Sequence, residues 1–224
     1  MHIKIVLILS FLFSEMALAD VYKCTNKNGK VALQDKPCEG LGPEFKEEAV
    51  KLDSTAKKSG IEIWDIKTAQ GNSYVIGLPS EWKVETGVKD GVSTMRSVVK
   101  GADPVTVLIS FIPISKLGGD KKTAFTSFMQ NMLGQRVGNA KEKIITSIDV
   151  KPAYLKDAFG RLVLLFDEEL AKIKDLGEGE YLYTLTGAIA TEPHLIYVSI
   201  LSNQPDSENT IKAYSSVSAI GESP

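Results

Sequence analysis

The chain of 224 residues is 43% hydrophobic and 24% charged, values typical of a globular protein rather than a disordered one. Its formal net charge of -2 gives no basic excess that would indicate a nucleic-acid partner, and no basic amphipathic segment indicates binding to a membrane surface. The length suffices for one domain of ordinary size plus a small appendage.

Residues 1–19 have the three parts of a secretory signal peptide. Lys4 supplies a positive charge, Ile5–Phe13 is an apolar run too short to cross a bilayer, and Ala17-Leu18-Ala19 is a small-residue cleavage site. We expect cleavage after Ala19, so that the mature chain begins at Asp20. No later stretch is apolar enough for a membrane span, and no cysteine follows the cleavage site to carry a lipid. The pattern predicts a soluble exported protein of the periplasm.

The two cysteines of the chain, Cys24 and Cys38, follow soon after the predicted cleavage site. Because export leads to an oxidising compartment, we expect one disulfide between them, with two free buried thiols as the alternative. Such a bridge would stabilise a closed loop of about 15 residues by about 3 kcal/mol. We expect no metal and no other cofactor, because two thiolates need two further ligands and the only histidine after cleavage, His194, is distant in the sequence.

Residues 20–38 predict a small disulfide-linked β-hairpin. Val21–Cys24 and Lys30–Gln34 favour strands, and Asn28-Gly29 between them is the strongest short hairpin signal. The run Val21–Cys38 resembles the short domain of unknown function 4124 (DUF4124), which is common just after the signal peptides of proteobacterial envelope proteins. Ala32-Leu33 stands where that family usually has an aromatic residue. The resemblance implies an envelope location and no particular chemistry.

Residues 39–60 differ in character from the segments on either side. Gly40, Gly42 and Pro43 interrupt regular structure, and Glu44–Lys58 is rich in lysine and glutamate. The segment is predicted to be a linker, with an exposed helix as the alternative. We therefore place the domain boundary here.

Residues 61–224 carry the main hydrophobic core, and the predicted strands outnumber the helices. Alternating or continuous apolar runs favour strands at 61–66, 73–77, 83–85, 92–99, 104–112, 141–150, 161–166, 180–190 and 195–202. Asp120 can cap a helix that runs to about Arg136, and Pro205 can open a terminal helix that buries Ile211, Tyr214, Val217 and Ile220. Residues 167–176 fit either a helical excursion or a continued strand. The fold class is α+β, with a central antiparallel sheet flanked by helices in an α/β/α sandwich.

A second resemblance covers this main part of the chain. The run Tyr74–Val84 contains Leu78-Pro79-Ser80-Glu81-Trp82 between two strands, and the chain ends in a strand hairpin, a polar loop and a helix. This order is similar to PsbP/Mog1-like domains, whose bacterial relatives include the DcrB-like and DUF1795 families. The resemblance implies an α/β/α sandwich with binding, chaperone or accessory roles, and it carries over no active-site residue.

Few residues are candidates for chemistry. Asp167, Glu168 and Glu169 cluster carboxylates that a hydrolase or a glycan-processing enzyme would use, although a solvated acidic loop explains them too. Trp82 fits core packing, or alternatively an aromatic platform for a glycan or peptide. His194 follows Pro193 at an expected turn, which predicts an exposed side chain. Ser54-Thr55-Ala56-Lys57 has the spacing of a penicillin-binding nucleophile motif but lies in the polar linker.

The leading hypothesis is a non-enzymatic exported envelope protein whose C-terminal domain binds or assists a protein partner. The alternative is a periplasmic hydrolase or glycan-processing enzyme that uses the carboxylates around Asp167–Glu169. A pocket with several convergent polar groups would favour the enzyme. An exposed apolar patch or an open sheet edge would favour the partner protein.

Overall fold

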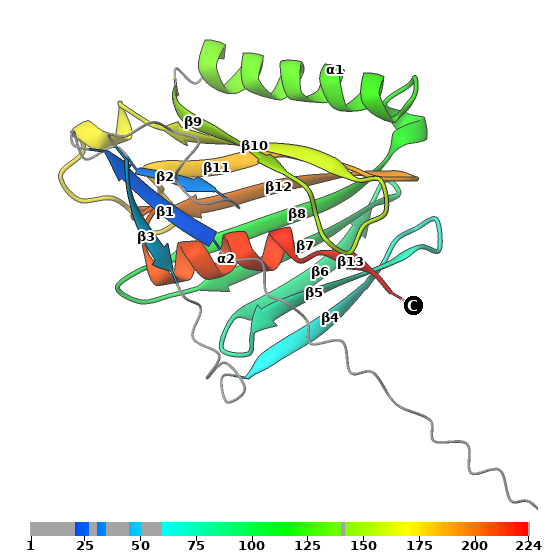
Figure 1. Cartoon of the computed structure of the whole chain (residues 1–224), viewed down its shortest axis with the longest axis horizontal. Coiled ribbons are helices and arrows are strands. Elements are labelled where there is room, and N and C mark those ends of the chain that lie inside the picture. Colours follow the sequence, from blue (N-terminus) through cyan, green and yellow to red (C-terminus); the bar gives the residue numbers. More distant parts are fainter. Residues whose placement is uncertain (1–20, 27–30, 35–44, 51–59, 140–141, 224) are drawn as a thin grey trace, which may run out of the picture.

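The computed structural model describes residues 21–26, 31–34, 45–50, 60–139 and 142–223. The described residues form a small N-terminal sheet and a larger body that contains two further sheets and the helices α1 and α2 (Figure 1). No helix within the described ranges combines the length and the hydropathy that a membrane crossing requires.

The N-terminal sheet contains β1 (Val21–Asn26), β2 (Val31–Gln34) and β3 (Phe45–Val50) in the order β2-β1-β3. β1 and β2 pair antiparallel, as the sequence predicts for these two strands. β3 pairs antiparallel with the other side of β1, so part of the segment predicted as a linker or helix is a strand. β3 therefore lies inside residues 39–60, the segment in which the sequence analysis places the domain boundary.

The larger body is built on a seven-stranded antiparallel sheet in the order β6-β7-β8-β12-β11-β10-β9. The strands are β6 (Lys83–Lys89), β7 (Val92–Val99), β8 (Val105–Pro113), β9 (Lys143–Val150), β10 (Phe159–Phe166), β11 (Tyr183–Ala190) and β12 (His194–Ser202). Short connections join β6 to β7 and β11 to β12, as expected for antiparallel neighbours. A second, three-stranded sheet, called the small sheet here, contains β4 (Ile61–Lys67), β5 (Ser73–Pro79) and β13 (Gly221–Glu222) in the order β13-β5-β4.

Different elements cover the two faces of the large sheet. α1 (Lys121–Leu133) packs on one face over β11 and β12, while α2 (Glu208–Ser218) and the small sheet cover the other (Figure 1). The core on the α2 side includes Tyr74 and Leu78 from β5 and Tyr214 and Val217 from α2. The sequence prediction of an antiparallel sheet with packed helices is confirmed at this level. The α2 face differs from a simple helical layer because the small sheet shares it.

Several element boundaries follow local signals in the sequence. The Asp120 side chain accepts a hydrogen bond from the Thr123 amide at 2.8 Å and caps α1, as predicted. α1 ends at Leu133, before the predicted Arg136, and a π-helical segment follows over Gly134–Asn139. Ser207 caps α2, so Pro205 lies in the preceding loop and does not open the helix.

β8 shows why the two faces of the sheet are buried to different extents. Val107, Ile109 and Phe111 are completely buried on the α2 side. Leu108, on the α1 side, is only half-buried, because α1 lies over β11 and β12 rather than over β8. One face of β8 is therefore fully buried and the other only partly.

Candidate functional site

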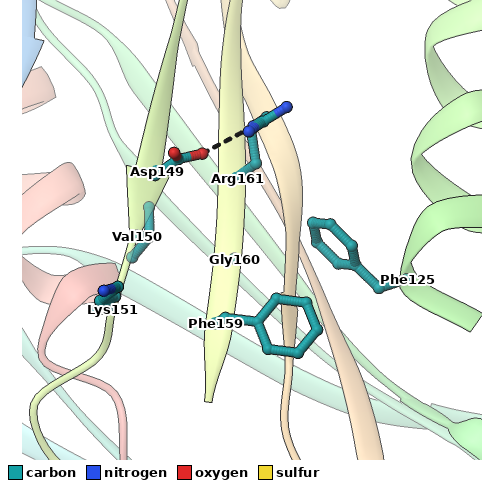
Figure 2. Close-up of a pocket in the computed structure, with 7 residues that line it drawn as sticks. All are labelled: Phe125, Asp149, Val150, Lys151, Phe159, Gly160 and Arg161. Atoms are coloured by element: carbon teal, nitrogen blue, oxygen red, sulfur yellow. Dashed lines mark hydrogen bonds and ion pairs between the residues drawn. The ribbon is translucent and has the colours of Figure 1, made fainter. Parts of the chain in front are cut away.

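A hollow opens on the α1 side of the large sheet, beside α1, where β9 ends and β10 begins (Figure 2). Its residues are Phe125 from α1, Asp149 and Val150 from β9, Lys151 just beyond it, and Phe159, Gly160 and Arg161 from β10. The volume is about 240 Å³. Ligand pockets for whole small molecules usually have about 300–1,000 Å³, so this hollow matches a single ring-sized group.

Strand register explains why these side chains meet. Arg161 lies opposite Asp149, and Gly160 lies opposite Val150. Phe159 and Lys151 each lie one residue beyond this last pair, where the paired region of the two strands ends. Because alternate residues of a strand share a face, the odd-numbered side chains stand on the α1 side, and the Gly160–Val150 pair forms the floor between them.

Two aromatic rings form one wall of the hollow. The rings of Phe125 and Phe159 meet edge to face, with centroids 5.1 Å apart and planes at 71°. Lys121 Nζ lies 5.9 Å from the centroid of the Phe159 ring and donates a hydrogen bond to the Asp157 carbonyl oxygen at 2.8 Å. The α1 side of the hollow is therefore apolar, with a cation beside it.

The other wall carries charged groups. Arg161 Nε donates to Asp149 Oδ1 at 2.8 Å across the two strands (Figure 2). Lys151 adds a second positive charge, so the lining has two cations and one carboxylate. The single acid is held in an ion pair, and the lining contains no serine, cysteine or histidine that could act as a nucleophile or a base. The lining thus offers two aromatic rings and two cations that can hold a ligand.

The acidic stretch does not form a common site. Asp167 Oδ1 accepts hydrogen bonds from the amides of Glu169 and Leu170, each at 2.9 Å, and so holds the loop that leads into the 3₁₀ turn Leu170–Lys172. The exposed Glu168 pairs with Lys143 at 3.4 Å, and the exposed Glu169 pairs with Lys172 at 2.6 Å. Each carboxylate thus has a separate local partner. Among the described residues, no group of three or more His, Cys, Asp or Glu side chains is arranged to hold a metal ion.

Trp82 and the two cysteines are the next residues that the sequence analysis singled out. Trp82 is buried in the core on the α2 side, so its ring packs against core side chains and does not form a surface platform. Cys24 lies on β1, but its side chain and the whole of Cys38 are outside the described residues. The predicted disulfide therefore stays a prediction.

His194 is completely buried, and the expectation of an exposed side chain was wrong. The residue begins β12 and pairs with Pro113 of β8, which places its ring on the α2 side of the sheet. The Nδ1 atom lies 3.0 Å from the Tyr74 hydroxyl, and Nε2 lies 2.9 Å from Gln70 Oε1. Because an amide oxygen can only accept, Nε2 carries the proton and Nδ1 accepts from the hydroxyl.

The charge states around His194 follow from burial. Burial lowers the pKa of the imidazole below its ordinary value of 6.5. Burial also raises the pKa of the Tyr74 phenol, and the negative charge of Glu222 raises it further. Both groups stay neutral, and neither partner of the imidazole is a carboxylate or a serine, so this is not a catalytic triad. The network instead ties the small sheet to the large one.

A largely buried ion pair lies on the α1 side, away from the hollow. Arg136 binds Glu142 through two parallel hydrogen bonds of 2.5 and 2.6 Å, and its Nη2 also donates to Thr184 Oγ1 at 3.0 Å. The hydrogen bonds to Glu142 are the main reason that the pKa of Arg136 is raised. The pair fastens the π-helical segment after α1 to β11, a structural role.

The small sheet presents an apolar surface on the side that faces away from the large sheet. Ile61 and Ile63 of β4 are 47% and 63% exposed, and Tyr154, which is 41% exposed, bridges to Gly221 of β13. Val75 of β5 lies between them, paired with Gly221. We call Ile61, Ile63, Val75 and Tyr154 the outer face. The sequence signal for this surface is the Ile-x-Ile pair, which is also the pattern of an ordinary core strand.

Local packing keeps the outer face flat, and the edge strand β4 borders it on one side. The Ile61 and Ile63 side chains lie against Gly77 of β5, where an added Cβ would be 3.1 Å and 3.5 Å from them. Within the described part of the chain, β4 pairs with β5 on one side only. An edge strand offers its unpaired amides and carbonyls to another strand.

Comparison with known proteins supports part of the sequence interpretation. Residues 8–61 match the family described as "Domain of unknown function (DUF4124)", which confirms the N-terminal resemblance and extends it through β3. No curated protein matches the sequence. A solved structure with a similar fold is the solution structure of cyanobacterial PsbP (CyanoP) from Synechocystis sp. PCC 6803. It is 16% identical and the match covers 77% of this chain and 99% of that chain, with a TM-score of 0.40. The comparisons thus support the N-terminal resemblance to DUF4124 over residues 8–61.

Proposed function

We propose that this chain is a non-enzymatic accessory protein, exported to the periplasm, that binds a protein partner through the outer face of the small sheet. The observation that carries the proposal is the exposure of Ile61 and Ile63 side by side on a strand whose outer edge is unpaired among the described residues. Large aliphatic side chains gathered on an edge strand mark interaction surfaces, because leaving them in water is unfavourable.

The mode of binding follows from the geometry of β4. An extended segment of the partner would add to the β4 edge through main-chain hydrogen bonds, and its apolar side chains would cover the outer face. Glu62 and Asp65 are exposed on the same strand, so basic side chains on the partner would add charge complementarity. The assignment to the periplasm rests on the predicted signal peptide, and the mass of protein from a periplasmic fraction should correspond to a chain that starts at Asp20.

A photo-crosslinking amino acid tests the docking surface directly. It would replace Ile63 in one variant and Val88 in a control, because Val88 is 62% exposed on β6, the edge strand of the other sheet. After irradiation of cells, the variant at Ile63 should form a covalent adduct with a second protein, which mass spectrometry identifies. The variant at Val88 should not form that adduct.

A second variant tests the apolar contact itself. Ile61→Ser removes aliphatic surface beside the crosslinker and should weaken the adduct formed at Ile63 without unfolding the protein, because Ile61 is half-exposed. Equal adducts at Ile63 and Val88, or no adduct at either position, would overturn the proposed docking surface.

A further inference from the structure

We propose that the hollow between α1 and the ends of β9 and β10 binds an aromatic carboxylate, with the ring against Phe125 and Phe159 and the carboxylate against Arg161 and Lys151. The site lies on the α1 side of the large sheet, whereas the outer face belongs to the small sheet on the α2 side (Figure 1). It is therefore a second site, distinct from the proposed docking surface.

The size and the apolar wall select a ring. The volume of about 240 Å³ holds one ring-sized group but not an extended molecule. Phe125 and Phe159 already meet edge to face, and a third ring can continue this arrangement because the positive edge of one ring attracts the negative face of another. The backbone of Gly160 and Val150 forms the floor, because even-numbered positions of these two strands face the α2-side core, as Ile148 and Val150 do.

The charged wall selects an anion. Lys151 and Arg161 face the hollow against the single carboxylate of Asp149, and Lys121 stands beside the Phe159 ring. A guanidinium has five N–H donors in a planar fork. Arg161 can therefore keep its Nε bond to Asp149 and donate to a second carboxylate. A neutral aromatic group would fill the space but would give these positively charged side chains no anionic partner.

Two sources supply this chemistry, a small aromatic acid and the C-terminal aromatic residue of a peptide. Four probes separate them: 3-phenylpropionate, its amide, the peptide Gly-Gly-Gly-Phe with a free C-terminus, and the same peptide amidated. Each is titrated into the purified protein while the backbone amide signals of Lys151 and Gly160 are followed by NMR. Saturable shifts with both acids are expected for a general aromatic-acid site, whereas shifts with the peptide acid alone identify a peptide C-terminus as the ligand.

Amidation and substitution test the role of charge. Each amide should bind at least about tenfold more weakly than its acid, because the ion pair with Arg161 and Lys151 is lost. Arg161→Gln should weaken binding of the acid by a similar factor. The matched control is Arg96→Gln, because Arg96 also faces the α1 side in a cross-strand pair, with Glu85 at 3.7 Å, and both arginine side chains are 54% exposed. Arg96→Gln should leave binding unchanged.

The amide spectrum away from the hollow shows whether Arg161→Gln keeps its fold, and Lys151→Gln gives an independent second variant at an exposed position. The proposal is overturned if neither acid gives saturable shifts, if the amides bind as well as the acids, or if Arg96→Gln weakens binding as much as Arg161→Gln. A positive result here, together with no crosslink at Ile63, would leave this site standing without the proposed docking surface.

Discussion

The ring nitrogens of His194 join two segments that are far apart in the sequence. Tyr74 belongs to β5 of the small sheet, Gln70 to the loop between β4 and β5, and His194 to the large sheet. The hydrogen bonds require a neutral imidazole, because Nδ1 must accept from the Tyr74 hydroxyl. A proton on both ring nitrogens would remove this acceptor and place a charge in a buried site.

This arrangement predicts that stability falls in mildly acidic solution. Since the pKa of His194 is lowered in the folded protein, the unfolded chain takes up a proton first as the pH drops. The contribution of His194 is complete above its ordinary pKa of 6.5 and is lost as the pH falls from there through the lowered pKa of the folded state. Urea unfolding at about pH 8 and about pH 5.5 should show this loss, since these values lie on either side of the ordinary pKa.

The variant His194→Gln provides the control, because an amide can both accept and donate without titrating. We expect this variant to be less stable than the original protein at about pH 8, by about 1–3 kcal/mol, since the hydrogen-bond geometry is poorer. Its stability should then change less between the two pH values. An equal change in both proteins would mean that other groups cause the pH dependence.

The three acidic residues of the loop after β10 should differ in their effect on stability. Asp167 accepts from two backbone amides, so Asp167→Ala should cost about 1 kcal/mol, as the loss of a helix cap does. Glu168→Gln and Glu169→Gln remove exposed ion pairs and should each change stability by no more than about 0.5 kcal/mol. Chemical denaturation measures all three.

The same variants test the alternative of a carboxylate hydrolase. If these residues only shape an exposed loop, each folded variant should still rescue the envelope phenotype of a deletion strain. Loss of rescue by Glu168→Gln or Glu169→Gln, with stability unchanged, would favour the hydrolase.

At the level of elements, the close approach of β10 and β11 depends on glycine. Gly187 lies opposite Leu162 in the middle of the large sheet, and a Cβ at Gly187 would be 1.9 Å from the Arg161 carbonyl oxygen. No side-chain rearrangement relieves a clash with backbone. We predict that Gly187→Ala destabilises the protein by about 3 kcal/mol or more, because the two strands must separate.

Gly87 on the edge strand β6 is the matched position. A Cβ there would lie 3.6 Å from Thr94 Oγ1, an ordinary contact. Gly87→Ala should therefore change stability by no more than about 0.5 kcal/mol. The midpoints of urea unfolding compare the two variants, and similar losses at both positions would contradict the close approach of β10 and β11.

The elements also show how far the sequence alone leads. Strong apolar alternation predicts β5, β7, β8 and β12, and the Asp120 cap predicts where α1 begins. β3 was missed because its sequence, Phe-Lys-Glu-Glu-Ala-Val, is rich in charged residues and pairs with β1 through backbone groups that any sequence possesses. His194 was misplaced because a turn signal at Pro193 does not reveal that a strand starts immediately afterwards.

The hollow could not be predicted for a related reason. Its side chains come from α1, β9 and β10, and only the register between β9 and β10 brings Lys151 and Arg161 beside Phe159. Pairing register between strands that are separated by a loop depends on the packing of the whole sheet. The sequence shows the residues, but their meeting point is a property of the fold.

At the scale of the whole molecule, the two proposed surfaces belong to different layers. The hollow lies beside α1 on one face of the large sheet, and the outer face lies on the small sheet, which covers the other face. Figure 1 shows these layers. Rigid layers allow each surface to change without moving the other. Ile61→Ser should therefore leave the aromatic-acid titration unchanged, and Arg161→Gln should leave the Ile63 crosslink unchanged.

The relation between the N-terminal module and the larger body leads to the last prediction. The two hydrophobic cores of the larger body contain residues from Trp64 onward, and the side chains of the N-terminal sheet lie outside the described ones. We predict that Cys24 and Cys38 form a disulfide in the exported protein, which peptide mapping under non-reducing conditions should detect. Cys24→Ser would then destabilise the N-terminal module, by about 3 kcal/mol for a loop of about 15 residues, and leave the larger body nearly unaffected.

Tryptophan fluorescence can follow the larger body separately. The chain has two tryptophans, and both Trp64 and Trp82 lie in or against the core on the α2 side. Their thermal transition should occur at the same Tm in Cys24→Ser, in the original protein, and in the original protein after reduction. If either treatment lowers this Tm by several degrees, roughly the effect of 1 kcal/mol on a domain of this size, the module and the larger body unfold as one unit. The module and the larger body would then not be separate folding units with a boundary between residues 39 and 60.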